Sequence, residues 1–196
     1  MKVLGKGSVA SVIRSGLGLA WIFCWIAAAV NVVVMIGYAV ASVMAATGGL
    51  DPQWLHEQSL RVRLNGGSVE NYQGPDWVLV YGTLAIALAG ISGALIIIWR
   101  LRKLFDSFLS GEPFRRENAY HLRIIWMTML VVEIVRLALF GVTGLLLHVF
   151  GGPDVRGHSS GIEYNITGWA SILILIILAE VFREGARLKE EQELTI

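Results

Sequence analysis

The sequence predicts an all-α membrane protein, a four-transmembrane-helix bundle with a small extracytoplasmic β-hairpin lid. Hydrophobic residues make up 55% of the 196 residues and charged residues only 16%, whereas a soluble domain carries about 25% charged residues. The chain also contains four runs that reach the roughly 20 apolar residues a membrane helix needs. The lid is predicted from an alternating pattern in one connecting loop.

The first uncharged run covers residues 15–50. It is too long for one straight crossing and too short for two crossings with a turn, so we expect one helix that Gly48 and Gly49 end. This run is more than twice the length of the apolar part of a signal peptide, about 7–15 residues, so we expect it to be retained. Residues 1–196 are expected to form a single membrane domain, with spans at about 17–45, 77–99, 124–150 and 166–182.

Lysine and arginine are distributed unevenly among the segments between these spans. Twelve lie in the N-terminal segment, the loop 100–123 and the tail 183–196, and three lie in the loops 51–76 and 151–165. Cytoplasmic segments of membrane proteins carry the excess of positive charge. We therefore expect both termini and the loop 100–123 to be cytoplasmic, and the other two loops to lie outside.

The outer loop 51–76 carries a hairpin signal. Leu60, Val62 and Leu64 alternate with arginines, and Asn65-Gly66 follows, which is a strong turn signal between strands. A third strand is conceivable near residues 161–165. A lid over the bundle is favoured over a ligand sensor, because the loop contains no recognised ligand motif.

Catalysis has little support in the sequence. The single cysteine excludes an internal disulfide framework and a cysteine metal cluster, and the histidines follow no zinc-site spacing. There is no nucleophile–base pair and no phosphate-binding glycine loop. We expect no enzyme activity, cofactor, metal or direct nucleic-acid binding.

Three polar residues fall inside the expected spans. Counted from the start of the third span, Glu133 is about 13 Å deep and Arg136 about 18 Å deep, and the two are close enough along a helix to pair. Asn31 of the first span lies at a similar depth. Ionisable residues in a bilayer are costly and face the bundle interior or a cavity. A buried packing network and a ligand pocket or ion path both fit, and the two readings are balanced.

The cytoplasmic segments are predicted to be helical. One short helix continues the second span to Ser110, before Gly111 and Pro113, and another starts near Arg115 and runs into the third span. Basic residues there can contact anionic lipid headgroups or only anchor the chain. The tail is predicted to extend the fourth span as a helix, with i,i+4 pairs Arg187–Glu191 and Lys189–Glu193. It is either a solvated helix end or a docking handle.

Small residues at helical spacing explain how the spans can pack. The second span carries Gly82, Ala85, Ala89 and Gly93 on one face, and such faces let helix backbones approach closely. This pattern fits contacts within one chain and contacts in a homo-oligomer equally well.

Two stretches resemble a known family. They are Gly111-Glu112-Pro113-Phe114-Arg115-Arg116-Glu117-Asn118 and Ile177-Leu178-Ala179-Glu180-Val181-Phe182-Arg183-Glu184-Gly185-Ala186-Arg187-Leu188. Both are similar to segments of bacterial four-span membrane proteins, the domain-of-unknown-function family 2975. Members of that family have no assigned reaction and are often encoded beside a small helix-turn-helix regulator of the Cro type.

The resemblance implies a membrane protein of the bacterial cytoplasmic membrane that holds or releases such a regulator. On this hypothesis the docking surface comprises Gly111, Pro113, Phe114, Asn118, Arg183, Glu184, Arg187 and Glu191. The first functional hypothesis is therefore a non-enzymatic sensor or docking partner of a cytosolic helix-turn-helix regulator. The alternative is a small transporter or channel that uses Glu133 and Arg136.

Overall fold

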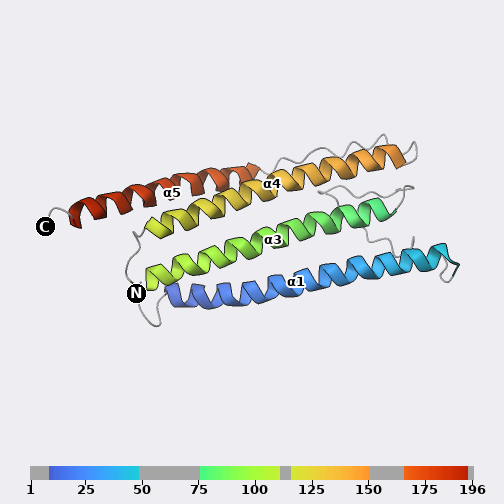
Figure 1. Cartoon of the computed structure of the whole chain (residues 1–196), viewed down its shortest axis with the longest axis horizontal. Helices are drawn as coiled ribbons and strands as arrows, with labels where there is room; N and C mark the ends of the chain where they lie inside the picture. Colours follow the sequence, from blue (N-terminus) through green and yellow to red (C-terminus); the bar gives the residue numbers. More distant parts are fainter. Residues whose placement is uncertain (1–8, 49–75, 111–115, 151–165, 194–196) are drawn as a thin grey trace. The chain divides into compact units, whose positions relative to one another are not determined.

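Four long helices account for nearly all of the residues that the structure, a computed structural model, describes: 9–48, 76–110, 116–150 and 166–193. The helices are α1 (Val9–Ala46), α3 (Asp76–Leu109), α4 (Arg116–Phe150) and α5 (Ile166–Glu193) (Figure 1). All four are long and apolar enough to cross a membrane, so the predicted fold class is confirmed to this extent. The described residues contain no strand. The segments predicted to form the β-hairpin lid lie outside them.

Each expected span falls within one of these helices, and the end of α1 is the one predicted. Gly48 has a φ of 76°, the left-handed conformation that glycine adopts at the end of many helices. The amide of Thr47 donates to the carbonyl of Val43 at 3.0 Å, and the amide of Gly48 donates to the carbonyl of Ala45 at 3.3 Å. These bonds satisfy carbonyls that the last turn of a helix would otherwise leave unpaired.

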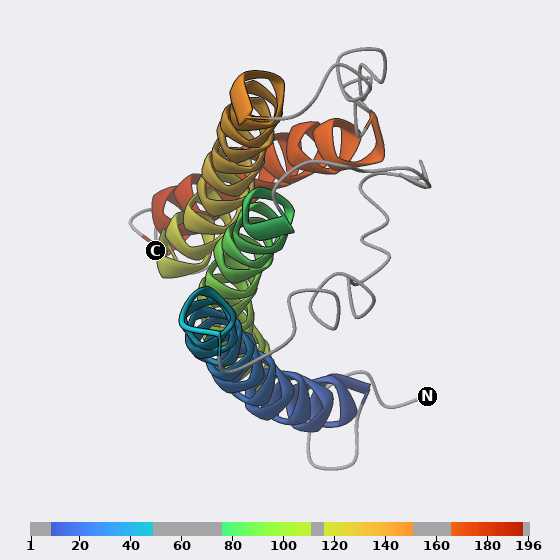
Figure 2. The ribbon, with the colours of Figure 1, turned by 90° about the vertical axis from the view of Figure 1, so that its right-hand side faces the viewer.

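The helices are longer than a bilayer is thick. The 34 residues of α3 span about 51 Å, against about 30 Å of hydrocarbon. The last ten residues of α3 belong to the expected loop 100–123, which was predicted to begin as a helix. The second helix predicted in that loop is the start of α4, which begins at Arg116 and continues through the third span. Figures 1 and 2 show each helix without a break. The surplus length carries the polar ends of the helices.

The chain divides into two compact units, and α1, α3 and α4 each contribute to both. The first unit consists of Met1–Ile26, Ile91–Glu133 and Asn165–Ile196, and the second consists of Ala27–Gly90 and Ile134–Tyr164. α5 lies entirely in the first unit.

The core of the first unit joins α3, α4 and α5. It is built from Leu104, Leu122, Ile125 and Ala179, with partly buried apolar side chains around them. The rings of Phe108 and Phe182 stack with their centroids 6.0 Å apart. This packing fixes the helix ends that carry most of the charge.

In the second unit, small and aromatic side chains hold α3 against α1 and α4. A Cβ at Gly82 would lie 2.5 Å from Oγ1 of Thr143, so only a glycine allows this approach of α3 to α4. The rings of Tyr38 and Tyr81 meet edge to face at 5.6 Å. The prediction that small residues on the second span let helices approach is confirmed at Gly82, and also at Gly93 in the first unit, where a Cβ would collide with Val132.

Many large apolar side chains point outward. Phe23 is 68% exposed, Val33 69% and Ile177 65%. A soluble protein rarely exposes apolar surface on this scale, whereas lipid tails solvate it. The exposed apolar surface therefore agrees with a multi-pass membrane protein.

Candidate functional site

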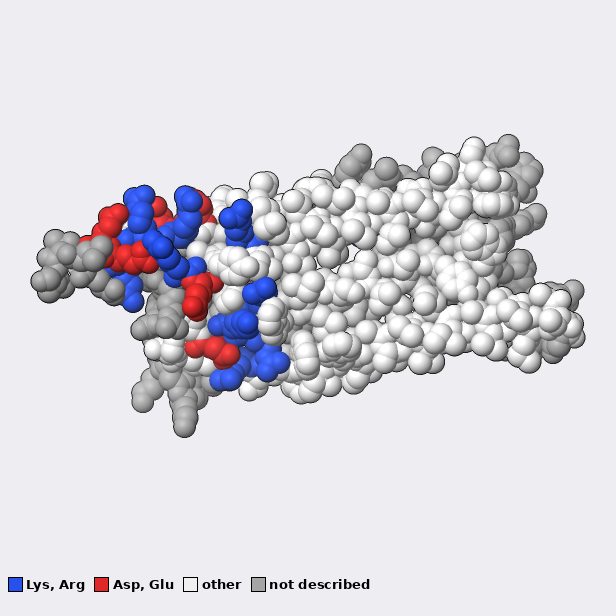
Figure 3. Space-filling model, in the orientation of Figure 1, with Lys and Arg blue, Asp and Glu red and all other residues white. Residues whose placement is uncertain are grey.

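The charged side chains of the described residues gather in the first unit. Among the Lys, Arg, Asp and Glu residues of the described helices, only Asp76, the first residue of α3, and Arg136 belong to the second unit. On the face shown in Figure 3, the coloured side chains lie over the charged ends of the helices in the first unit. A site for a polar or charged partner is therefore sought there.

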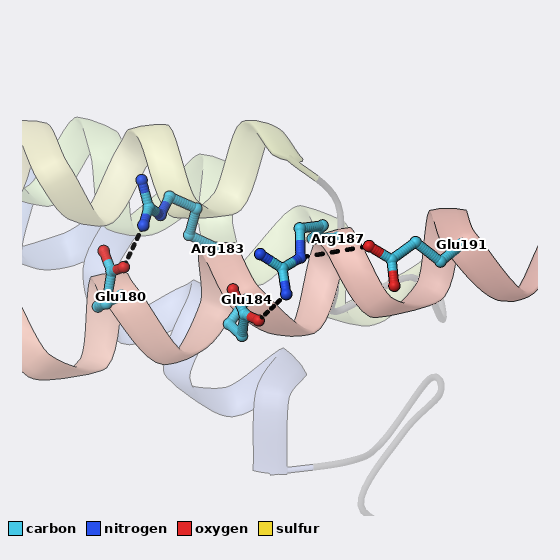
Figure 4. A network of polar contacts seen from close by, with 5 residues as sticks. All are labelled: Glu180, Arg183, Glu184, Arg187 and Glu191. Atoms are coloured by element: carbon cyan, nitrogen blue, oxygen red, sulfur yellow. Dashed lines mark hydrogen bonds and ion pairs between the residues drawn. The ribbon is translucent and has the colours of Figure 1, made fainter.

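The C-terminal part of α5 carries a ladder of ion pairs along one side (Figure 4). Arg183 pairs with Glu180, and Arg187 lies between Glu184, at 2.5 Å, and Glu191, at 3.4 Å. The i,i+4 pair Arg187–Glu191 predicted from the sequence is confirmed. Each of these five side chains is more than 40% exposed, so the pairs are solvent-facing and add little stability. Their charged groups remain accessible to a partner.

An open groove of about 730 Å³ lies between α4 and α5 within the first unit. We call it the α4–α5 groove. It is lined by Arg116, Ala119, Tyr120, Arg123, Trp126, Ile176, Ala179, Glu180, Arg183, Glu184 and Arg187. Four arginines and two glutamates give the lining a net charge of +2. Glu190 and Glu191 lie outside this lining but pair with Arg116 and Arg187, so the suitability of the groove for an anion depends on an arginine that no described carboxylate pairs with.

The arginines of the α4–α5 groove are not equivalent. Arg116 pairs with Glu190 of α5 at 2.7 Å, and Arg183 and Arg187 belong to the ladder on α5. Arg123 is exposed, and it forms no ion pair with any described residue. Among the arginines of the groove, Arg123 is the one that no described carboxylate pairs with.

The basic residues of α3 are engaged with aromatic rings. The Lys103 ammonium lies 4.0 Å from the centre of the Trp99 ring, and the Arg100 guanidinium lies 4.5 Å from it. Arg102 lies 5.9 Å from the ring of Trp21. Such contacts attract a cation to the face of a ring and anchor these side chains near the boundary of the apolar stretch.

The three intramembrane polar residues predicted from the sequence fall in different units. Glu133, which is 8% exposed, belongs to the first unit, and Arg136 and Asn31 belong to the second. Neither Glu133 nor Arg136 lacks an interaction partner. Asn31 is also 8% exposed. Its amide nitrogen donates a long hydrogen bond of 3.4 Å to the carbonyl of Leu84, and its Oδ1 accepts none from the described residues.

The predicted docking residues divide into three groups. Gly111, Pro113 and Phe114 lie outside the described residues. Asn118 is 1% exposed, and its amide donates to Oγ of Ser107 at 2.8 Å, so it joins α4 to α3 and takes no part in the exposed surface. The four residues of α5, Arg183, Glu184, Arg187 and Glu191, belong to the ladder described above.

The α4 wall of the groove was not singled out from the sequence. Arg116, Tyr120, Arg123 and Trp126 are spaced by four, three and three residues, which places them on one face of a helix. This helical spacing is the sequence signal from which the α4 wall of the groove could have been predicted. In the described part of the chain, no three His, Cys, Asp or Glu side chains come together as a metal site requires.

One comparison with known proteins gives a match. The model of the family described as "Protein of unknown function (DUF2975)" matches residues 68–196. These residues include both stretches on which the resemblance was based. No curated protein and no solved structure matches the chain.

Proposed function

Because the chain belongs to the DUF2975 family, whose description assigns no activity, we propose a function from its own residues. It is a non-enzymatic, multi-pass membrane protein that docks a cytosolic helix-turn-helix regulator. The docking element is the C-terminal end of α5, residues 184–193, called the α5 extension below.

The observation that carries this proposal is the continuity of α5. The helix runs from Ile166 to Glu193, so the α5 extension continues the fourth span without a break, although Gly185 could have introduced a bend. Leu188 is 50% exposed, between the exposed charges of Arg187 and Glu191. Protein interfaces combine apolar side chains with polar ones at their rim, and an exposed leucine close to charged residues fits such an arrangement.

The charge of the α5 extension indicates the kind of partner. Four glutamates outnumber Arg187 and Lys189, so this segment has a net charge of −2 within a chain whose net charge is +1. Helix-turn-helix regulators carry basic surfaces because they neutralise DNA phosphates. An acidic helix can compete for such a surface, and opposite charges also speed encounter.

The proposal includes a location in a bacterial cytoplasmic membrane, with both termini in the cytoplasm. All described lysines and all described arginines except Arg136 belong to the first unit. The positive-inside rule assigns helix ends of this kind to the cytoplasm. The α5 extension then faces the compartment where a DNA-binding regulator is found, which supports a signalling role.

The transporter alternative would use Glu133 and Arg136. Burial of Glu133 at 8% exposure and the presence of partners for both side chains are what a packing role requires. No observation favours transport over packing, so the docking function is preferred.

The proposal is tested by purifying the full-length protein from native membranes beside a variant that ends at Arg183. A small helix-turn-helix protein identified by mass spectrometry with the full-length chain is then purified, and its affinity is measured for both forms. We expect the truncation to weaken binding at least tenfold.

A matched pair of charge variants tests the electrostatic part. Glu191→Lys should weaken binding severalfold, and added salt should weaken it further. Glu117→Lys makes the same change on an exposed residue of α4 outside the α5 extension and should leave binding unchanged. Equal binding by the full-length and truncated forms, or equal effects of the two substitutions, would refute the docking function.

A further inference from the structure

We propose that the α4–α5 groove binds the headgroup of an anionic phospholipid, with the phosphate on Arg123. This site is separate from the α5 extension, and it does not depend on the proposed docking function. It is carried by two features of the groove: an exposed arginine that forms no ion pair with any described residue, and a change from charged to apolar residues along the length of the groove.

Arg123 supplies the group that recognises the phosphate. A guanidinium presents a planar fork of donors that fits two phosphate oxygens. The other three arginines of the groove are paired with glutamates of α5, so a ligand must separate an existing pair to bind them. Arg123 is exposed and forms no ion pair with any described residue. It can accept an anion without that cost.

The lining changes in character along the groove. Arg116 contacts Glu190, near the end of α5, whereas Ile125 packs in the same core as Ala179, more than two turns earlier in α5. α4 and α5 therefore run antiparallel. The end of the groove near Arg116 and Arg187 is charged, and the end near Trp126 and Ile176 is apolar.

Such a gradient fits an amphiphile better than a small ion. Arg116 and Trp126 are ten residues apart on α4, or about 15 Å, which is enough for a headgroup and the first part of an acyl chain. Tyr120, between them, is 58% exposed, and tyrosine and tryptophan favour the level of lipid headgroups. Free phosphate would use only the charged end and would leave the apolar end in contact with water.

The guanidinium of Arg123, which no described carboxylate pairs with, also indicates which phospholipid binds. A zwitterionic lipid brings a cation beside its phosphate, and Arg123 would repel that cation. An anionic lipid such as phosphatidylglycerol brings none. The groove is therefore expected to select phosphatidylglycerol over phosphatidylcholine.

Native mass spectrometry of the full-length protein in a mild detergent tests this site. Phosphatidylglycerol and phosphatidylcholine are added separately at equal concentration, and the bound fraction of each is measured. We expect preferential binding of phosphatidylglycerol, and about fivefold weaker binding after Arg123→Gln, the loss typical of one basic residue at an anionic surface. Arg123→Lys should be intermediate, because it keeps the charge and loses the fork.

Arg102→Gln is the matched control. It removes one arginine of the same unit, on α3 against Trp21 rather than in the groove, and it should leave selectivity unchanged. Arg123 is exposed, so the variant should retain the thermal unfolding midpoint of the wild type, which is measured in parallel.

Three results would overturn the proposal. The first is equal binding of the two lipids. The second is an equal loss of phosphatidylglycerol binding in Arg123→Gln and Arg102→Gln, which would indicate a general effect of surface charge. The third is displacement of the lipid by an equal concentration of inorganic phosphate, which would identify the ligand as free phosphate.

Discussion

Replacing Gly93 by alanine is expected to destabilise the protein by separating α3 from α4. A Cβ at Gly93 would collide with a methyl group of Val132, whereas a Cβ at Gly90, one turn earlier on the same helix, would meet nothing within 4 Å. Valine in a helix has one strongly preferred rotamer, so the methyl group cannot easily move aside. Overpacking of this kind costs about 1–3 kcal/mol.

Gly90→Ala is therefore the matched control. Both substitutions gain the same small advantage of alanine over glycine in a helix, at most about 1 kcal/mol, so the difference between them isolates the collision. We expect Gly93→Ala to be less stable than Gly90→Ala by about 1–3 kcal/mol. The free energy of unfolding is measured by detergent titration with circular dichroism.

A second substitution tests the cause. Val132→Ala removes the methyl group that the new Cβ would meet, so Gly93→Ala should cost less in a Val132→Ala background than in the wild type. Equal stability of Gly93→Ala and Gly90→Ala would refute the close contact of α3 and α4 at this position. An equal cost of Gly93→Ala in both backgrounds would assign that cost to another contact.

The same titration checks three further expectations. Asn118→Ala should cost about 1–3 kcal/mol, because it removes a fully buried amide that donates to Ser107; a cost below about 0.5 kcal/mol would contradict this role. Asn31→Leu should cost less than about 1 kcal/mol, since among the described residues the side chain of Asn31 makes one long hydrogen bond and its Oδ1 accepts none; a loss above about 2 kcal/mol would reveal a larger role. Arg116→Gln should change stability by less than about 1 kcal/mol, because Arg116 and Glu190 are exposed at 76% and 44%; a larger loss would show that this pair holds α4 to α5.

The spans could be predicted because a bilayer imposes a simple rule on sequence. About 20 apolar residues in a row leave few options besides a membrane helix, and Gly48 ended α1 as expected. The continuation of α3 to Leu109 and of α5 to Glu193 also followed from local spacing. These features depend on residues close together in the chain.

The groove could not be predicted in the same way because it depends on residues far apart. Arg116 and Glu190 are 74 positions apart, and only the antiparallel packing of α4 and α5 brings them together. Asn118 shows the opposite problem. The family resemblance placed Asn118 in the docking surface, but its 1% exposure and its contact with Ser107 place it in the interior.

The side of the membrane on which the α5 extension lies is the most direct test of the proposed function. Leu188→Cys is introduced into a Cys24→Ser background, which removes the single native cysteine, and is labelled with a membrane-impermeant maleimide. Because Leu188 is 50% exposed, we expect rapid labelling in inside-out membrane vesicles and none in intact spheroplasts. Labelling in intact spheroplasts would place the α5 extension outside the cytoplasm and would exclude docking of a cytosolic regulator.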